Sequence, residues 1–349
     1  MGCVWKPLVG LCIVLLMEAS SADEWSSRAN PGLILDRARI KNNRPIIGIL
    51  TQEATAGLLR AGEGQVILAS YVKMVESAGA RAAPIFVDRT PEEIEKMFHS
   101  VSGVVFPGGH IKLNASRYAA VGKQILELAI KENLKGEVFP VWAECLGLEL
   151  ISMIISGVSL NHGQYKNNLL HYTDARNLLL PLKLTPDFRQ SKLFGTASQQ
   201  LIDHIQSHPI AYNNHIKGIS PKKFHRYKRL SNMFRIVSTN VDRQGSEFIA
   251  TLEGREMPLF LFHWHPSKPM FEWSTEKVFS HSQEAIWLGQ HVADVFINQA
   301  RQSGHRFPTR REEARALIYN YPVTYTGVET TFMQAYFFQM TNRNASALP

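Results

Sequence analysis

Between residues 44 and 157 the sequence alternates short apolar runs with segments of helical periodicity, and this alternation limits the fold more than any other feature. The pattern predicts strands and helices in turn, with strands over 46–51, 81–88, 101–109 and 136–144 and helices over 67–80, 90–98, 116–133 and 146–156. Parallel neighbours need long connections, so a chain of this kind forms a mostly parallel sheet with right-handed crossovers. The sequence therefore predicts an α/β fold in which helices flank the sheet.

Local signals define several helix ends. Thr90 is placed as an N-cap, Pro91 takes the first helical position and Glu93 completes a capping box. Gly79 and Gly157 follow two helical segments, and we expect them to end those helices.

The second half of the chain is less regular. The pattern is weak over 158–246, returns as two late strands over 247–254 and 258–266, and continues as a long helix over 283–301. An aromatic segment, 321–340, is expected to pack back on the body. We find no internal repeat and no linker rich in Gly, Pro or Ser, and so predict one α/β domain over 44–330, followed by a C-terminal tail over 331–349.

The N-terminus has the features of a cleaved secretory signal. Lys6 precedes a short apolar stretch, Leu8–Met17, and Ser20 and Ala22 stand at −3 and −1 of a cut before Asp23. We therefore predict a signal peptide over 1–22, a polar leader over 23–43 and a secreted protein. No later stretch is apolar enough to span a bilayer, so stable membrane insertion is not expected.

The net charge of +8 raises the question of an anionic partner. Lys and Arg are scattered, however, and the densest group, "PKKFHRYKRL" over 221–230, lacks the glycine-aromatic pattern of an RNA-binding sheet. A solvated basic face is the better interpretation, and nucleic-acid binding is not expected.

Cysteine usage separates one thiol from the rest. Cys3 and Cys12 leave with the signal peptide, so Cys145 is the only cysteine of the mature chain and no intramolecular disulfide can form. Two sequons, at Asn114 and Asn344, fit a secreted glycoprotein.

Cys145 stands between a predicted strand and a predicted helix, where catalytic groups collect in parallel sheets. Free N–H groups at a helix N-terminus lower the pKa of a thiol and can receive an oxyanion. In "AECLG", Gly147 keeps one glycine of a nucleophile elbow and Ala143 replaces the other. The alternative is a buried, inert cysteine.

A thiol nucleophile needs a base, and the "FHWHP" segment offers two histidines after a late strand. His265 lies at the strand's end, where the site is expected, whereas His263 is interpreted as a packed histidine. Gly108 and Gly109 end another strand and let backbone N–H groups approach a ligand.

These motifs, in the order "FPGG", "VWAECLGLEL" and "HWHP", resemble the gamma-glutamyl hydrolase family within the class I glutamine amidotransferase-like (flavodoxin-like) fold. The resemblance spans about residues 44–327. It implies a secreted or lysosomal cysteine hydrolase that cleaves gamma-glutamyl bonds of folate or antifolate poly-gamma-glutamates through a thioester. No metal or cofactor is implied, and a homodimer is compatible with it.

The resemblance also assigns roles. Cys145 matches the nucleophile and His265 the catalytic histidine. Gly108, Gly109 and Leu146 would supply oxyanion N–H groups. His215 matches a histidine thought to meet the substrate. A thiolate–imidazolium pair that can persist at mildly acidic pH is expected, which suits a lysosome.

Three departures from the family pattern surround the site. One is the segment "GQVIL" before "ASYVK", which stands where the family has a tyrosine-rich segment, so an aromatic substrate surface is missing. Ala143 and Glu144 replace the usual Gly-Thr before the cysteine, and a carboxylate beside the thiol is expected to raise its pKa. Ser267 replaces the usual glutamate after the histidine and is the candidate orienter of the imidazole. The alternative function is therefore a catalytically impaired member of the family that acts as a binding or vestigial protein.

Overall fold

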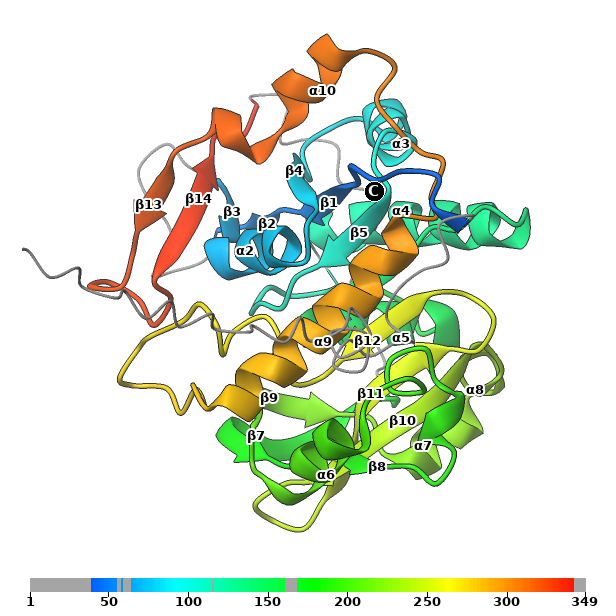
Figure 1. The fold of residues 1–349 in the computed structure, drawn as a ribbon, viewed down its shortest axis with the longest axis vertical. Coiled ribbons are helices and arrows are strands. Elements are labelled where there is room, and N and C mark those ends of the chain that lie inside the picture. Colours follow the sequence, from blue (N-terminus) through cyan, green and yellow to red (C-terminus); the bar gives the residue numbers. More distant parts are fainter. Residues whose placement is uncertain (1–38, 55–57, 59–63, 115, 161–167, 342–349) are drawn as a thin grey trace, which may run out of the picture.

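A central sheet dominates the structure, a computed structural model that describes residues 39–54, 58, 64–114, 116–160 and 168–341. Its eight strands run in the order β4-β1-β5-β6-β12-β11-β10-β8 (Figure 1). The first five are parallel, and these are β4 (Arg81–Ile85), β1 (Ile46–Leu50), β5 (Gly103–Phe106), β6 (Val141–Glu144) and β12 (Leu259–Phe262). The remaining three are antiparallel, and these are β11 (Glu247–Gly254), β10 (Phe234–Val241) and β8 (Lys183–Leu184).

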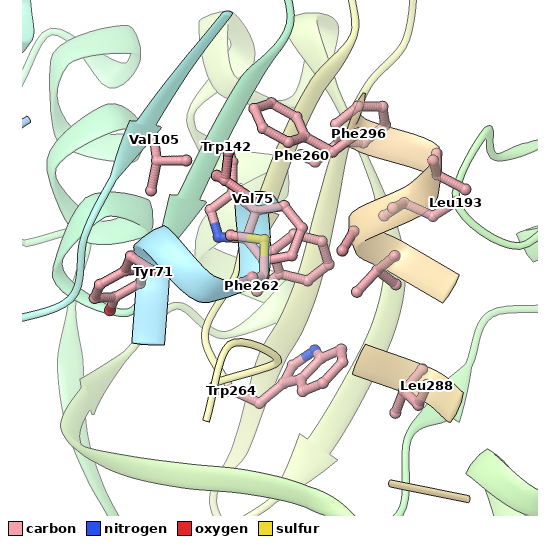
Figure 2. Close-up of a cluster of buried hydrophobic side chains, with 14 of the residues drawn as sticks. Tyr71, Val75, Val105, Trp142, Leu193, Phe260, Phe262, Trp264, Leu288 and Phe296 are labelled. Carbon is pink, nitrogen blue, oxygen red and sulfur yellow. The ribbon is translucent and has the colours of Figure 1, made fainter. Parts of the chain in front are cut away.

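Helices cover both faces of this sheet, as predicted. One buried cluster packs the sheet against α2 (Ala69–Ser77), α6 (Gln199–Ser207) and α9 (Gln283–Ala300). The other packs it against α3 (Pro91–Phe98), α4 (Arg117–Leu134), α5 (Leu146–Ser156), α7 (Pro221–Arg226) and α8 (Lys228–Met233). Figure 2 shows the first cluster, in which Trp142, Phe260 and Phe262 of the sheet face Phe296 of α9.

Two small antiparallel sheets complete the fold. One has the order β13-β14-β3-β2, and its strands are Val323–Tyr325, Gln334–Phe338, Gln65–Leu68 and Gln52–Glu53. The other is a ribbon of β7 (His171–Leu180) and β9 (Ala211–Gly218). A last helix, α10 (Arg310–Ala316), and two short 3-10 turns, Phe188–Gln190 and Ile318–Asn320, lie on connections.

The predicted caps are confirmed. The Thr90 side chain and Glu93 form the capping box of α3, and Gly157 ends α5 in the left-handed region at φ 72°. One helix boundary was wrong, because Ile67 and Leu68 belong to β3 and α2 begins only at Ala69. Strand β14 pairs with β3, so the aromatic C-terminal segment packs back on the α/β domain as expected.

The ribbon and strand β10 lie in the region of weak pattern and were not predicted as strands. The predicted signal peptide, most of the polar leader and Asn344 lie outside the described residues. In the described part, none of the helices combines the length and apolarity needed to cross a membrane.

Candidate active site

Cys145 occupies a strained turn between β6 and α5. Its backbone has φ 52° and ψ −106°, a conformation that costs energy for a residue with a side chain. The Cys145 N–H donates to the Phe262 carbonyl of neighbouring β12 at 2.7 Å. Position 147 requires glycine, because the backbone carbonyl of Phe106 lies so close that a Cβ would collide with it. The turn therefore has the geometry of a nucleophile elbow, with Gly147 at its second glycine position.

His265 follows the end of β12, the strand beside β6. In the parallel register Phe262 lies opposite Glu144, so the two strands end at the same edge of the sheet. Both Cys145 and His265 line one cavity at this edge. A Cβ built on Gly108 would lie 3.1 Å from Cys145 Cβ and 3.2 Å from His265 Cε1, which places the PGG turn between the two groups.

Glu144 is the direct partner of the imidazole. Its Oε1 lies 2.7 Å from His265 Nδ1 and accepts hydrogen bonds from Tyr71 Oη at 3.0 Å and Ser267 Oγ at 2.9 Å. Glu144 is fully buried. Burial raises its pKa, but the bonds from His265 and neighbouring groups outweigh that effect and the pKa is lowered overall, so the carboxylate is ionised.

This arrangement corrects the interpretation of Ser267 as the orienter of His265. The Ser267 hydroxyl donates to Glu144, not to the imidazole, so its effect on the ring is indirect. Sequence reasoning treated Glu144 only as a neighbour of the thiol. A glutamate that ends a buried strand next to the histidine-bearing strand was the available signal, because parallel strands bring their ends together.

Burial also sets the charge state of the reacting pair. Burial raises the pKa of the Cys145 thiol well above its ordinary value, helped by the charges of Glu149 and Glu144 and opposed by the Leu146 N–H. Burial lowers the pKa of His265, although Glu144 opposes this. Burial therefore disfavours the charged form of each group, which corrects the expected lowering of the thiol pKa and opposes the expected thiolate–imidazolium pair.

The imidazole is ready to take a proton on its second nitrogen. His265 Nδ1–H donates to Glu144, which fixes the tautomer and leaves Nε2 as the acceptor. Among the described residues, buried Nε2 has no hydrogen-bond partner.

The expected oxyanion donors are not equivalent. The Leu146 N–H is directed at the Cys145 side chain, where it opposes the rise of the thiol pKa. The Gly108 N–H, by contrast, donates to the Tyr71 hydroxyl at 2.8 Å, so it is not free to bind an oxyanion in this structure. Gly109 lines the cavity one residue further on. Leu146 and Gly109 therefore remain the candidate donors, and the expectation for Gly108 is corrected for this structure.

His215 does not reach the cavity, contrary to expectation. Its ring stacks on that of His263, with centroids 3.7 Å apart, and its Nδ1 lies 2.9 Å from the Lys217 carbonyl oxygen. Residues alternate in direction along β9, so Tyr212 and Asn214 line the cavity instead. His263 is fully buried, in agreement with its interpretation as a packed histidine.

The cavity joins this polar centre to an apolar wall that includes Phe279 and Phe332. Lys268 lies buried beside the centre, where its ammonium donates to Ser70 Oγ at 2.8 Å and lies 3.8 Å from the ring centroid of Tyr71. Across the described residues, we find no group of three His, Cys, Asp or Glu side chains that could hold a metal ion. The sequon residue Asn114 lies away from the cavity lining, in a half-buried turn.

Comparison with known proteins agrees with this geometry. The family model Peptidase C26 matches residues 45–267. Gamma-glutamyl hydrolase of Rattus norvegicus is 37% identical over 89% of this chain and 94% of its own, and that of Bos taurus is 39% identical over 84% and 90%. Among solved structures, a glutamine amidotransferase from Thermotoga maritima aligns over 74% of this chain and 99% of its own, with 10% identity and a TM-score of 0.44. The chain belongs to the gamma-glutamyl hydrolase family of cysteine peptidases, peptidase family C26.

Proposed function

We propose that this gamma-glutamyl peptidase hydrolyses folate or antifolate poly-gamma-glutamates through a thioester on Cys145. One observation carries the proposal: the thiol at the strained turn and the imidazole with a free Nε2 line the same cavity. The cavity's apolar wall suits an aromatic head group, and the names of the relatives point to gamma-glutamyl bonds.

The first half of the reaction forms the thioester. His265 Nε2 takes the thiol proton while Sγ of Cys145 attacks the γ-carbonyl carbon. The N–H groups of Leu146 and Gly109 stabilise the oxyanion of the tetrahedral intermediate. The imidazolium then gives its proton to the departing nitrogen as the C–N bond breaks, while Glu144 stabilises the positive ring.

The second half releases the acyl group. Water enters the vacated position and gives a proton to His265 Nε2 as its oxygen attacks the thioester carbonyl. When the C–S bond breaks, the sulfur of Cys145 recovers a proton from the imidazolium, and both groups return to their neutral forms.

We further propose that the protein acts after entry into the secretory pathway, in the extracellular space and the lysosome. The support is the sequence of residues 1–22 and the sequons at Asn114 and Asn344. A neutral His265 at mildly acidic pH suits a lysosomal base, because its pKa is lowered by burial.

The test is incubation with folate pentaglutamate over about pH 5–7, with products separated by chromatography. We expect wild type to release shortened folates and Cys145→Ala to release none while keeping the same circular dichroism and melting temperature. Wild-type turnover by Cys145→Ala would refute the nucleophile assignment. An inactive wild-type protein that still binds the pentaglutamate would instead identify the binding or vestigial alternative.

A further inference from the structure

Three basic side chains gather at the cavity, on the side of the β7–β9 ribbon. His110 follows the PGG turn and lines the cavity, and Lys277 lines it from the segment after β12. Arg176 is an exposed residue of β7. Burial lowers the pKa of His110, and the charges of Arg176 and Lys277 lower it further, so Arg176 and Lys277 are the cations of this group and the His110 ring is favoured in its neutral form. We call these three residues the cationic rim.

The backbone that carries the rim is fixed in place. Asn177 has a positive φ of 48°, its Nδ2 donates to the Glu276 carbonyl at 3.2 Å and its Oδ1 accepts from the Val278 N–H at 3.0 Å. These two bonds enclose Lys277 and tie it to the strand that bears Arg176.

Two further bonds connect this support to the cavity wall. The Asn177 N–H donates to Asn214 Oδ1 at 3.1 Å, and Asn214 lines the cavity. Arg243 donates to the carbonyl oxygens of Arg176 and Asn177 at 2.8 and 3.0 Å. The backbone that carries Arg176 and Lys277 is therefore tied to the wall of the cavity.

The charged side chains of the rim are not paired within the described part of the chain. Within the described part of the chain, the side chains of Arg176, Lys277 and His110 form neither ion pairs nor hydrogen bonds. The acidic lining residue Glu53 accepts the Arg117 N–H at 2.6 Å on Oε1, while its buried Oε2 has no hydrogen-bond partner among the described residues. Glu149 is the one acid that acts noticeably on His110. Adjacent cations without counterions are typical of a site that receives an anion.

We propose that His110, Arg176 and Lys277 form a subsite for the free α-carboxylates of a γ-linked oligoglutamate tail. The inference rests on the proposed function, which places a γ-glutamyl bond at Cys145. Each γ-linked residue leaves one α-carboxylate free, so a longer tail carries more negative charge to the rim. The rim therefore selects substrates by the number of glutamates and not by the aromatic head group.

The experiment compares the length dependence of wild type with that of Arg176→Ala/Lys277→Ala. For a folate pentaglutamate we expect the double substitution to raise KM roughly tenfold, because an exposed ion pair contributes about two- to fivefold per cation. The value of kcat should hold, and a diglutamate should be affected much less. The difference should shrink between about 20 mM and about 300 mM NaCl, because salt screens exposed charges. Lys183→Ala, which removes one exposed charge on the edge strand β8, outside the cavity lining, is the control and should behave as wild type.

Equal changes in KM for both chain lengths, or an unchanged KM for the pentaglutamate, would refute the proposal that the rim binds the glutamate tail. Failure of the proposed function has a different signature, because wild type would then hydrolyse neither substrate. In that case calorimetric titration of pentaglutamate into Cys145→Ala, with and without the rim substitutions, decides the inference. Weaker binding without the rim supports it, and equal binding rejects it.

Discussion

Replacing Glu144 by glutamine removes the charge beside the imidazole while keeping the side chain's shape. The glutamine carbonyl can still accept from His265 Nδ1, Tyr71 and Ser267, the donors that now share Oε1. The new amide takes the place of Oε2, which has no partner among the described residues. The substitution therefore tests the charge more than the packing.

The expected loss follows from the change in hydrogen-bond type. A bond to a charged partner contributes about 1.5–3 kcal/mol and a neutral one about 0.5–1.5 kcal/mol. The difference of about 1–2 kcal/mol applies when the ring becomes imidazolium in the transition state, because that is when the carboxylate's charge is most needed. We expect kcat to fall about 5- to 30-fold with little change in KM.

The pH dependence of kcat gives a second, independent test of the role of Glu144. Turnover needs neutral His265 as base, so the acid limb follows the pKa of this histidine. Burial lowers this pKa and Glu144 raises it. Removing the carboxylate should lower the pKa further, so the acid limb of Glu144→Gln should move to lower pH although the maximum rate falls.

The assay is the pH profile of kcat on a folate polyglutamate, with melting temperatures to confirm folding. The matched control is Glu149→Gln, which removes another carboxylate near the thiol that acts on the pKa of Cys145. An unchanged rate with an unmoved limb in Glu144→Gln would refute the role of the carboxylate. A limb that moved to higher pH would show that Glu144 acts on a different group.

Four further substitutions test the site. His265→Ala should cost at least about 100-fold in kcat, whereas His263→Ala should cost mainly stability, and equal small losses in both rates would contradict the base assignment. Ser267→Glu should lower both kcat and melting temperature, because it buries a second carboxylate against Glu144, and a gain in rate would show that the imidazole lacks support. Gly147→Ala should lower the free energy of unfolding, measured with denaturant, by more than about 1 kcal/mol, because the added Cβ collides with a backbone carbonyl. An unchanged free energy of unfolding would show that the backbone carbonyl does not lie so close to residue 147.

The parallel half of the fold could be predicted because its signals are local. Each of its elements has an apolar run, a cap or a glycine stop within a few residues, as at Thr90 and Gly157. The β7–β9 ribbon has no such signal. Its strands are separated by α6 and by 30 residues between Leu180 and Ala211, its register shifts twice, and many of its side chains are only half buried. Pairing over that distance depends on tertiary contacts that no short pattern encodes.

The same contrast applies to the site. Cys145 and His265 could be located because each follows a recognisable strand, and strand ends meet at one edge of the sheet. The direction of the Glu144 side chain could not be predicted, because it depends on the register of β6 against β12. His215 was misplaced because β9 was not predicted as a strand, so the alternation that turns Asn214 to the cavity and His215 away from it could not be applied.

The two buried carboxylates near the thiol affect its activation in opposite ways. Proton transfer from Cys145 to His265 becomes harder as the gap between their pKa values widens, and burial widens it from both sides. A negative charge raises both pKa values, so what matters is which group it affects more. Glu144 contacts the imidazole at 2.7 Å and narrows the gap. Glu149 is the charge that most raises the thiol pKa, and it widens the gap. Glu149→Gln should therefore keep or increase kcat under conditions in which Glu144→Gln lowers it. A parallel loss in both variants would mean that the two carboxylates act only through packing.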